Sequence, residues 1–254
     1  MTLLDRGDPL FDKIYEVLWA KILAGEIPRG SRVSDLEWSA KLNVSRTPVR
    51  EAMRKLQQDG ILLPLSRTGY EIRRMERSDL DGLYRCRAVL EGLAVHDAIP
   101  HLSKGQRDNL SLMVDQTRRA LKNKDFNLAF KLNTQFHDIL VEASCNPHLL
   151  TLLKRLRRMI LFARSSLMGA AHHSDFTHSY SVHLLKTQTD HKEILALIGM
   201  GDAEGASKRM QTHILSTAED MKLLASKLPG GAGSDRLKDD VPTVPTSSPL
   251  LPNS

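Results

Sequence analysis

The feature that most constrains the fold of this chain is the helical spacing of its apolar residues from Asp79 to residue 226. Successive segments repeat apolar residues at intervals of three and four, and none shows the polar–apolar alternation of a strand. An all-helical domain is therefore expected over residues 79–226. Its helices are expected from Asp79 and at about 104–122, 125–145, 147–171, 177–199 and 203–226. The stripe that the first of these helices is expected to bury consists of Leu83, Cys86, Leu90 and Leu93.

Residues 1–75 carry a different pattern, in which three helices precede two short extended runs. The first helix is expected over residues 11–25. A second, capped by Ser34 or Asp35, follows the Pro/Gly turn EIPRGSRV, and a third begins near Arg46. The inward side chains expected in the first two helices are Ile14, Val17, Leu18 and Ile22, then Leu36, Ala40 and Leu42.

The sequence ILLPLSRTGYEIRRM, which follows the third helix, predicts two short strands joined by a turn that contains Gly69. Three helices followed by a hairpin is the order of a winged helix-turn-helix domain. The fold expected for the whole chain is mainly α, with a winged helix-turn-helix domain over residues 1–75, a linker at 76–78 and an all-helical bundle at 79–226. The tail, residues 227–254, is dense in Pro, Gly and Ser and is predicted to be disordered.

Composition favours a polyanionic partner. The formal net charge is +6 and the sequence pI is near 9.4, although many basic proteins simply carry solvated lysines. Cys86 and Cys145 lie far apart without CxxC spacing, so neither a disulfide framework nor a zinc ribbon is expected. The N-terminus is interrupted by acidic residues, and no segment has the apolar length of a membrane span. A cytoplasmic protein without a membrane partner is expected.

The third helix, in NVSRTPVREAMRKLQQDG, carries an arginine at every fourth position. Because residues four apart differ by only about 40° around a helix, Arg46, Arg50 and Arg54 form one cationic row. The apolar row, offset from it, consists of Val49, Met53 and Leu56. The cationic row is therefore expected to face solvent.

The start of this helix has the chemistry of a phosphate- and base-binding surface. Pro48 is tolerated only in a first turn, which places that turn near Arg46, with Ser45 or Thr47 as the cap. Free backbone N–H groups and small hydroxyls bind phosphates, and the arginine fork also fits the O6/N7 edge of guanine. An ordinary solvated helix face is the alternative for an isolated arginine row. Its position on the third helix of a winged module favours DNA recognition.

Three of the ten histidines occupy related positions. His191 and His213 flank a helical hairpin that turns near residue 201, each roughly 15 Å from the turn, so they can face each other. Asn133 and His137 lie four apart on another helix and share one face. Three imidazoles with an oxygen donor suit a divalent ion of the zinc, nickel or manganese type with open positions. Core histidines bonded to neighbouring carbonyls are the alternative, and spacing alone leaves both open.

Two sets of segments resemble a known family. ILAGEIPRGSRV and LNVSRTPVREAMRKLQQDGIL resemble the N-terminal domain of the GntR family of bacterial transcriptional regulators. YRCRAVLEGLAV, NTQFHDILVEASCNPHLL and DHKEILALIGMGDAEGASKRMQTHI resemble the all-helical effector domain, of the FCD type, in the FadR-like branch of that family. Together they cover about residues 10–225.

The resemblance implies roles for individual residues. Those that would contact bases, phosphates or, for the glycine, the minor groove are Ser45, Arg46, Thr47, Arg50 and Gly69. The ligands of the metal-binding members fall on Asn133, His137, His191 and His213, with Asn133 in place of the family's aspartate. A neutral amide oxygen is a weaker donor than a carboxylate, so metal affinity should fall unless a water or effector oxygen helps.

Arg87 matches a position kept as Arg in the family, beside Glu91. It can serve as an i, i+4 partner of Glu91, or as a cation for an acidic effector. The function expected is a DNA-binding transcriptional regulator, most often a repressor in this family. It would act as a homodimer on a palindromic double-stranded operator. Its effector would be a small organic acid bound at the metal.

A metal-dependent hydrolytic enzyme with a DNA-binding appendage is the alternative, because three histidines on an ion also describe hydrolytic zinc sites. Such an enzyme needs a general base near the ion. The candidates are Asp138, Asp190 and Glu193, and their sequence positions relative to the histidines place none of them well. No catalytic residue is therefore expected.

Overall fold

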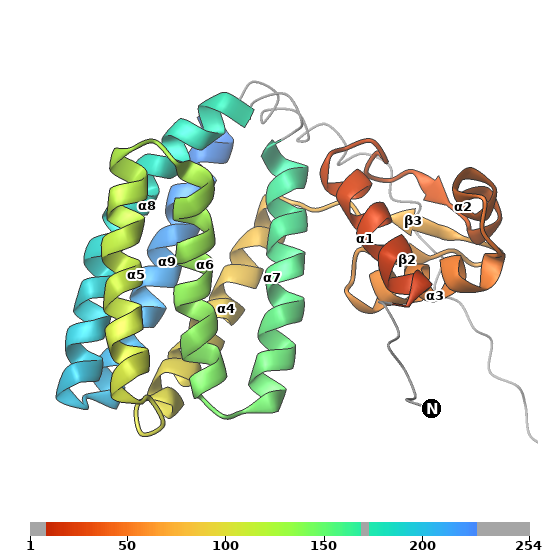
Figure 1. Cartoon of the computed structure of the whole chain (residues 1–254). Coiled ribbons are helices and arrows are strands. Elements are labelled where there is room, and N and C mark those ends of the chain that lie inside the picture. Colours follow the sequence, from red (N-terminus) through yellow and green to blue (C-terminus); the bar gives the residue numbers. More distant parts are fainter. Residues whose placement is uncertain (1–8, 169–172, 228–254) are drawn as a thin grey trace, which may run out of the picture.

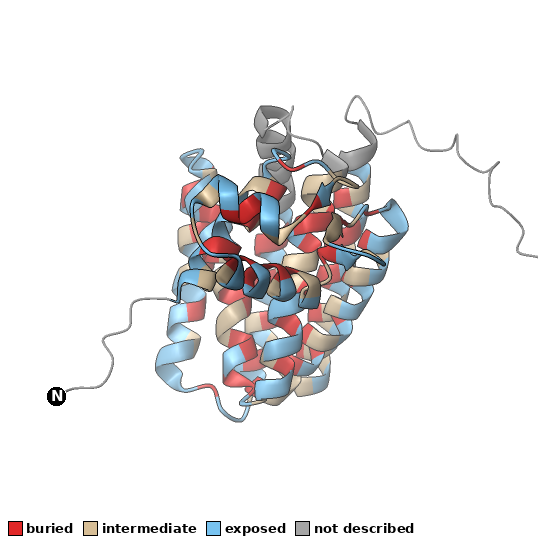
Figure 2. Ribbon diagram, turned by 90° about the vertical axis from the view of Figure 1, so that its right-hand side faces the viewer, coloured by how far each residue is buried: buried red, intermediate tan, exposed pale blue. Residues whose placement is uncertain are grey.

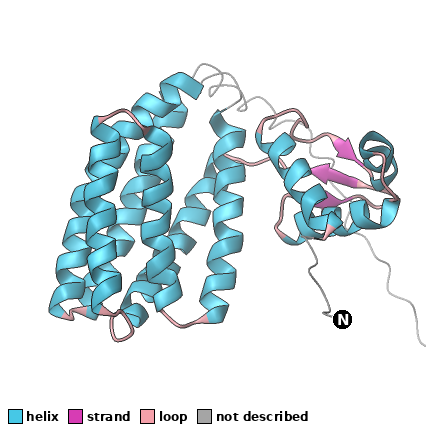
Figure 3. Ribbon diagram, viewed as in Figure 1, coloured by secondary structure: helices cyan, strands magenta, loops and turns pink. Residues whose placement is uncertain are grey.

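The computed structural model describes residues 9–168 and 173–227, and in this part of the chain the strands are confined to a small N-terminal domain (Figure 3). The rest is helical, as the sequence predicts. Figure 1 shows the small domain beside one end of a bundle of long, roughly parallel helices. The predicted disordered tail, residues 227–254, lies outside the described residues apart from Lys227, the last residue of a helix.

The N-terminal domain has the expected winged order with one additional strand. Its elements are α1 (Leu10–Leu23), β1 (Arg32–Val33), α2 (Asp35–Leu42), α3 (Arg46–Gln58), β2 (Leu62–Pro64) and β3 (Tyr70–Ile72). The sheet is antiparallel in the order β1-β3-β2, with Val33 opposite Tyr70 and Leu62 opposite Ile72. Strand β1 was not expected, because two residues inside a Pro/Gly turn are too short to show alternation.

The core of this domain follows the predicted row on α3, where Val49, Met53 and Leu56 are at most 1% exposed. On α1 the predicted Ile14, Leu18 and Ile22 are buried, but Val17 is 41% exposed. On α2 the prediction was wrong for Leu36, which is 63% exposed, and for Ala40, which is also exposed. The phase of α2 is set by its N-cap, Ser34, whose side chain accepts a hydrogen bond from the Glu37 backbone. With the helix in that phase, the inward side chains are Trp38, Ser39 and, in part, Leu42.

The helical domain contains α4 (Arg77–Ala98), α5 (Lys104–Lys122), α6 (Phe126–Ala143), α7 (Pro147–Met168), α8 (His173–Met200) and α9 (Ala203–Lys227). The predicted bounds are close, except that α8 begins four residues earlier than expected and α4 begins at Arg77, inside the predicted linker 76–78. Buried residues recur among exposed ones along the helices of the bundle (Figure 2). Among the described helices, none is long and apolar enough to cross a membrane.

Helix α4 buries a different face from the one predicted. It packs on α9, α7 and α6 through side chains that include Leu80, Tyr84, Ala88, Glu91 and Val95. Cys86 is exposed, Leu93 is 44% exposed, and the neighbouring Val89 is 62% exposed. Helix α9 approaches so closely that a Cβ on Gly92 would lie 2.7 Å from the Gln211 side chain. The small residues Ala88 and Gly92 therefore select the packed face. Of the predicted stripe, Leu83 and Leu90 are half-buried against the core, whereas Cys86 and Leu93 are left exposed.

Candidate DNA-reading surface and metal centre

The start of α3 is arranged as the sequence predicts. Ser45 is the N-cap residue, with extended backbone, but its hydroxyl makes no capping hydrogen bond. Arg46 is the first helical residue, Pro48 lies in the first turn, and that turn contains no acidic residue in this fully described helix. Ser45 and Thr47 are both exposed. The first backbone N–H groups and two hydroxyls are thus available to an anion.

The arginine row of α3 faces solvent and is ordered by a carboxylate of α2. The side chains of Arg46 and Arg50 are 53% and 56% exposed. Asp35, only 17% exposed, accepts hydrogen bonds from Arg46 Nη2 at 3.0 Å and from Arg50 Nη2 at 2.8 Å. Burial by itself would raise the pKa of Asp35, but these two arginines lower it. The sequence indicates Asp35 only as a possible helix cap, because its contact with the arginines joins two helices and leaves no local pattern.

Gly69 lies at the tip of the wing, between β2 and β3, as predicted. Its φ of +84° belongs to the left-handed region, and a Cβ there would lie 2.8 Å from the carbonyl oxygen of Val33. Its own carbonyl oxygen accepts a hydrogen bond from the Leu65 backbone at 3.1 Å. A side chain is therefore excluded, because it would collide with the backbone of β1.

Three helices of the second domain bring three predicted histidines together. His137 on α6, His191 on α8 and His213 on α9 are each at most 2% exposed, and one ring nitrogen of each lies within 4.8 Å of the others. We call them the histidine triad. The Nε2 atoms of His191 and His213 are 3.3 Å apart. Two nitrogens bound to one tetrahedral zinc at about 2.0–2.1 Å would lie roughly 3.3 Å apart, so this pair already has the spacing of shared ligands.

Carboxylates hold two of the three imidazoles. Glu91 on α4 lies 2.6 Å from Nδ1 of His137, and Asp190 on α8 lies 3.0 Å from Nδ1 of His213. These bonds leave Nε2 of both rings to face a ligand, which is the carboxylate–histidine arrangement that orients metal ligands. The sequence indicates Glu91 only as a partner of Arg87, and Asp190 only as a poorly placed candidate base.

The buried setting keeps His137 and His191 neutral. Burial lowers the pKa of His137 to about 4, although Glu91 opposes the shift. Burial and the two neighbouring imidazoles lower the pKa of His191 well below its usual value. Burial would raise the pKa of Glu91, but Arg87 and His137 outweigh it, so the pKa falls and the carboxylate is ionised. Neutral imidazoles beside a fixed anion are in the protonation state that metal binding requires.

Two of the helices that carry these side chains, α4 and α6, also carry an unsatisfied buried oxygen. Asn133 lies one turn before His137 on α6, and its Oδ1 has no hydrogen-bond partner among the described residues. Tyr84 lies on the buried face of α4 that carries Glu91, and its Oη is likewise unpaired within residues 9–168 and 173–227. Leaving a buried polar group unpaired costs about 1–3 kcal/mol, so such groups call for an ion, a water or a ligand. The residues present therefore fit a divalent ion.

Arg87 makes the predicted i, i+4 contact, with Nε 2.7 Å from Oε1 of Glu91. Its side chain is 14% exposed, and Arg157 of α7 approaches the same oxygen at 3.9 Å. Arg87 is thus joined to the triad through the carboxylate that holds His137. Positive charge beside the triad suits an anionic ligand.

The candidate bases of a hydrolytic enzyme are engaged in ion pairs. Asp138 pairs with Arg157, and Asp190 pairs with Arg209 as well as with His213. Glu193 lies 2.5 Å from Arg209. A carboxylate held by arginine is a weak proton acceptor, because the cation stabilises its ionised form. The site thus suits ligand binding better than general-base catalysis.

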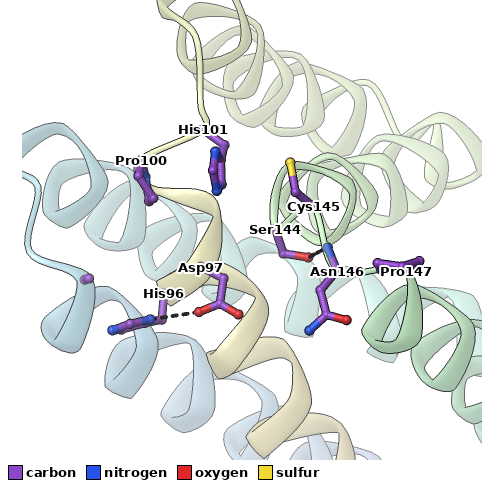
Figure 4. A pocket seen from close by; sticks show the side chains of 9 residues that line it. His96, Asp97, Pro100, His101, Ser144, Cys145, Asn146 and Pro147 are labelled. Atoms are coloured by element: carbon purple, nitrogen blue, oxygen red, sulfur yellow. Dashed lines mark hydrogen bonds and ion pairs between the residues drawn. The ribbon is translucent and has the colours of Figure 1, made fainter.

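An open hollow of about 610 Å³ lies between the end of α4 and the turn that precedes α7 (Figure 4). His96, Asp97 and His101 from the end of α4 form one wall, and the turn around Cys145 before α7 forms the other. His96 Nδ1 lies 3.0 Å from the Asp97 carboxylate. None of the triad lines this hollow, and its titratable side chains are exposed or half-buried. The hollow is therefore distinct from the histidine triad.

A winged helix-turn-helix domain with exposed arginines on its third helix, joined to a helical domain, defines a DNA-binding regulator of the winged-helix class. Comparison with known families agrees: residues 10–72 match the bacterial regulatory proteins of the gntR family, and residues 82–216 match the FCD domain. The chain belongs to the GntR family of transcriptional regulators, in the group that carries an FCD domain.

Individual relatives support this membership. The chain is 29% identical over 221 residues to the uncharacterized HTH-type transcriptional regulator YdhC of Bacillus subtilis, covering 86% of this chain and 94% of YdhC. It is 25% identical over 202 residues to a probable D-xylose utilization operon transcriptional repressor of Paenarthrobacter nicotinovorans, covering 80% and 84% of the two chains. The solved structure of E. coli McbR/YncC shares the fold, with a TM-score of 0.64 at 19% identity, covering 86% of this chain and 99% of that one.

Proposed function

We propose that the protein is a repressor that binds a palindromic operator as a homodimer, and that a small carboxylate bound at a divalent ion in the histidine triad controls this binding. The observation that carries the proposal is the joint occurrence of two features. The first is the solvent-facing row of Arg46 and Arg50. The second is a buried triad whose nitrogens are spaced as metal ligands.

The DNA half of the proposal rests on the start of α3 and the wing. The residues assigned to DNA contact are Ser45, Arg46, Thr47, Arg50 and Gly69. The α3 side chains would enter the major groove, and Gly69 would approach the minor groove from the wing. Phosphate contacts release counterions, so operator affinity should fall steeply as salt rises. That the D-xylose relative is named a repressor favours repression here as well.

The homodimer rests on symmetry and on helix α4. A palindromic operator requires two recognition helices related by a two-fold axis. The outer face of α4 carries Val89 and Leu93 at 62% and 44% exposure, beside the exposed Cys86. A second copy of the chain would cover this apolar face. Dimer formation should therefore be weakened by Val89→Asp, measured by sedimentation velocity.

The proposal that an effector binds at the metal rests on the residues that would coordinate the ion. His137, His191 and His213 would supply three nitrogens and Asn133 an amide oxygen, and the ion would then coordinate a carboxylate at an open position. Arg87 would add a charge-assisted contact to that carboxylate. Effector binding would act on the DNA only if its affinity differs between two arrangements of the winged domains.

Elemental analysis of the purified, tag-free protein tests the site directly. We expect about one divalent ion per chain in the wild type and its loss in His137→Ala and His191→Ala. His148→Ala, an exposed histidine of α7, is the matched control and should keep the ion. No ion in the wild type after loading with zinc, nickel or manganese would reject the metal site. An ion whose loading, with or without added carboxylates, never changes DNA affinity would reject its regulatory role.

A further inference from the structure

Helix α7 contacts the winged domain through Arg158, and it is the helix of the bundle nearest to that domain (Figure 1). Arg158 Nη1 lies 3.1 Å from the Asp59 carboxylate and also donates to the Tyr15 hydroxyl. Its guanidinium stands over the Tyr15 ring at 4.7 Å. The Tyr15 hydroxyl in turn donates to Asp59 at 2.6 Å. One cation thus joins α7 to two helices of the winged domain.

The position of Asp59 gives this contact its significance. Asp59 is the C-cap of α3, so it lies at the opposite end of the recognition helix from Arg46. A cation near a helix C-terminus is favourable because the last carbonyls carry partial negative charge. Tyr15, the other partner, is fully buried in α1. Arg158 therefore contacts the C-terminal end of α3, and the N-terminal end of the same helix carries the residues assigned to DNA contact.

A second contact runs in the opposite direction. Arg29, in the segment between α1 and β1, donates to the hydroxyls of Ser166 at 2.8 Å and Ser165 at 2.7 Å, both on α7. Its third donor bonds the Ile22 carbonyl at 2.6 Å, and its guanidinium lies 4.3 Å from the centre of the Phe162 ring. Every nitrogen of Arg29 is therefore engaged, and the two contacts together oppose rotation of the winged domain on α7.

The residue beside Arg158 approaches the carboxylate that holds His137. Arg157 Nη2 lies 3.9 Å from Oε1 of Glu91, and Arg157 also pairs with Asp138. Glu91 is the carboxylate that holds His137. Consecutive residues of one helix thus contact the carboxylate behind a proposed metal ligand and the end of the recognition helix. Because α7 is a continuous helix from Pro147 to Met168, a shift at one residue moves the other.

We propose that Arg158 is a positioning residue for DNA recognition: it fixes α3 on α7, and the neighbouring contact of Arg157 with Glu91 couples that position to the occupancy of the histidine triad. The coupling rests on the metal site proposed above, whereas the positioning role of Arg158 does not. In this contact the Asp59 carboxylate and the Tyr15 hydroxyl share the guanidinium of Arg158.

Hydrogen exchange tests the positioning role without any ligand. Arg158→Ala should raise amide exchange about fivefold or more near Tyr15 and in residues 55–60, and Arg158→Lys should restore part of the protection because it keeps the cation. Arg155→Ala, an exposed arginine on the same helix, is the control and should change neither segment. Unchanged exchange at both segments in Arg158→Ala would overturn the positioning role.

Zinc alone tests the coupling. The DNA ligand is a duplex selected by the wild-type protein from a random pool, and its affinity is measured with and without zinc. Zinc should change the DNA affinity of the wild type, and this change should shrink to less than about twofold in Arg158→Ala. Elemental analysis should show that the variant still binds zinc. The coupling would be overturned if zinc changed the DNA affinity of Arg158→Ala as much as that of the wild type. It would also be overturned if a zinc-loaded wild type showed no change in DNA affinity. A wild type that binds no zinc would instead reject the metal site, and exchange would still decide the role of Arg158.

Discussion

Glu91 lies 2.6 Å from Nδ1 of His137, and both side chains are only 2% exposed. A buried carboxylate in this position fixes the ring orientation and the tautomer, so that Nε2 carries the free lone pair. Burial disfavours the negative charge of Glu91, and the positive charges of Arg87 and Arg157 help to offset this cost. The triad is therefore one part of a larger charge network that reaches α4 and α7.

Removing the charge of Glu91 should weaken metal binding without removing a ligand. We expect Glu91→Gln to lower zinc affinity by about 10–100-fold, because the amide stabilises the metal-bound imidazole less and no longer fixes its tautomer. Competition with a chromogenic chelator measures the change. Glu142→Gln, on the exposed face of α6, is the control. An affinity equal to wild type in Glu91→Gln would show that this carboxylate plays no part in the site.

Acid should destabilise the metal-free protein through His137. The unfolded chain takes up a proton on this residue near pH 6.5, whereas the folded chain does so only near pH 4. Between these values the unfolded state binds more protons, so the free energy of unfolding falls as pH falls, by about 3 kcal/mol at most from this group. Urea unfolding of chelator-treated protein from pH 7 to 4 measures the slope. His137→Gln should flatten it, and an equally steep slope in that variant would contradict the assignment.

The sequence predicts the triad but not the side chains that support it. Helical spacing alone brings His191 opposite His213, because both sit equally far from one turn. The roles of Glu91 and Asp190 depend on which face each helix turns inward, and α4 has two apolar ridges between which its sequence does not choose. Close packing of Gly92 against α9 selects the ridge that contains Glu91. The same ambiguity explains why Leu36 was wrongly predicted to be buried. Helix α2 is short, and its N-cap determines which face turns inward.

Restoring the carboxylate at position 133 should strengthen the metal site. Asn133→Asp replaces an unsatisfied neutral oxygen by an anionic donor, and we expect zinc affinity to rise by about tenfold or more. The same substitution should destabilise the metal-free protein, because it buries a charge that lacks a partner. Calorimetric titration with zinc, and thermal unfolding with and without it, measure the two effects. Tighter binding without apo destabilisation would mean that Oδ1 does not sit in a buried site.

Arg50 and Arg54 should differ in their effect on DNA binding although they belong to one row. We expect Arg50→Ala to weaken binding to selected DNA by about 10–100-fold, the range for loss of a bidentate base contact. Arg54 lies one turn further from the helix start and pairs at 3.6 Å with Glu51, so Arg54→Ala should change affinity less than about threefold. Fluorescence anisotropy compares the variants, with circular dichroism as the check on folding. Equal losses would indicate general electrostatic attraction rather than base recognition.

Asp35 should raise affinity for selected DNA and lower affinity for random DNA, and so improve discrimination between the two. It holds the guanidinium groups of Arg46 and Arg50 in one arrangement before DNA arrives, which lowers the entropy lost on docking. It also places a negative charge next to the DNA surface, which weakens phosphate-driven binding to any sequence.

Asp35→Asn removes both effects. Affinity for selected DNA should therefore fall and affinity for random duplex should rise, reducing their ratio by about 3–10-fold at one salt concentration. Glu37→Gln, an exposed acid on the same helix that pairs with Lys41, is the control for charge alone. An unchanged ratio in Asp35→Asn would mean that the arginines need no support from α2 to recognise their bases.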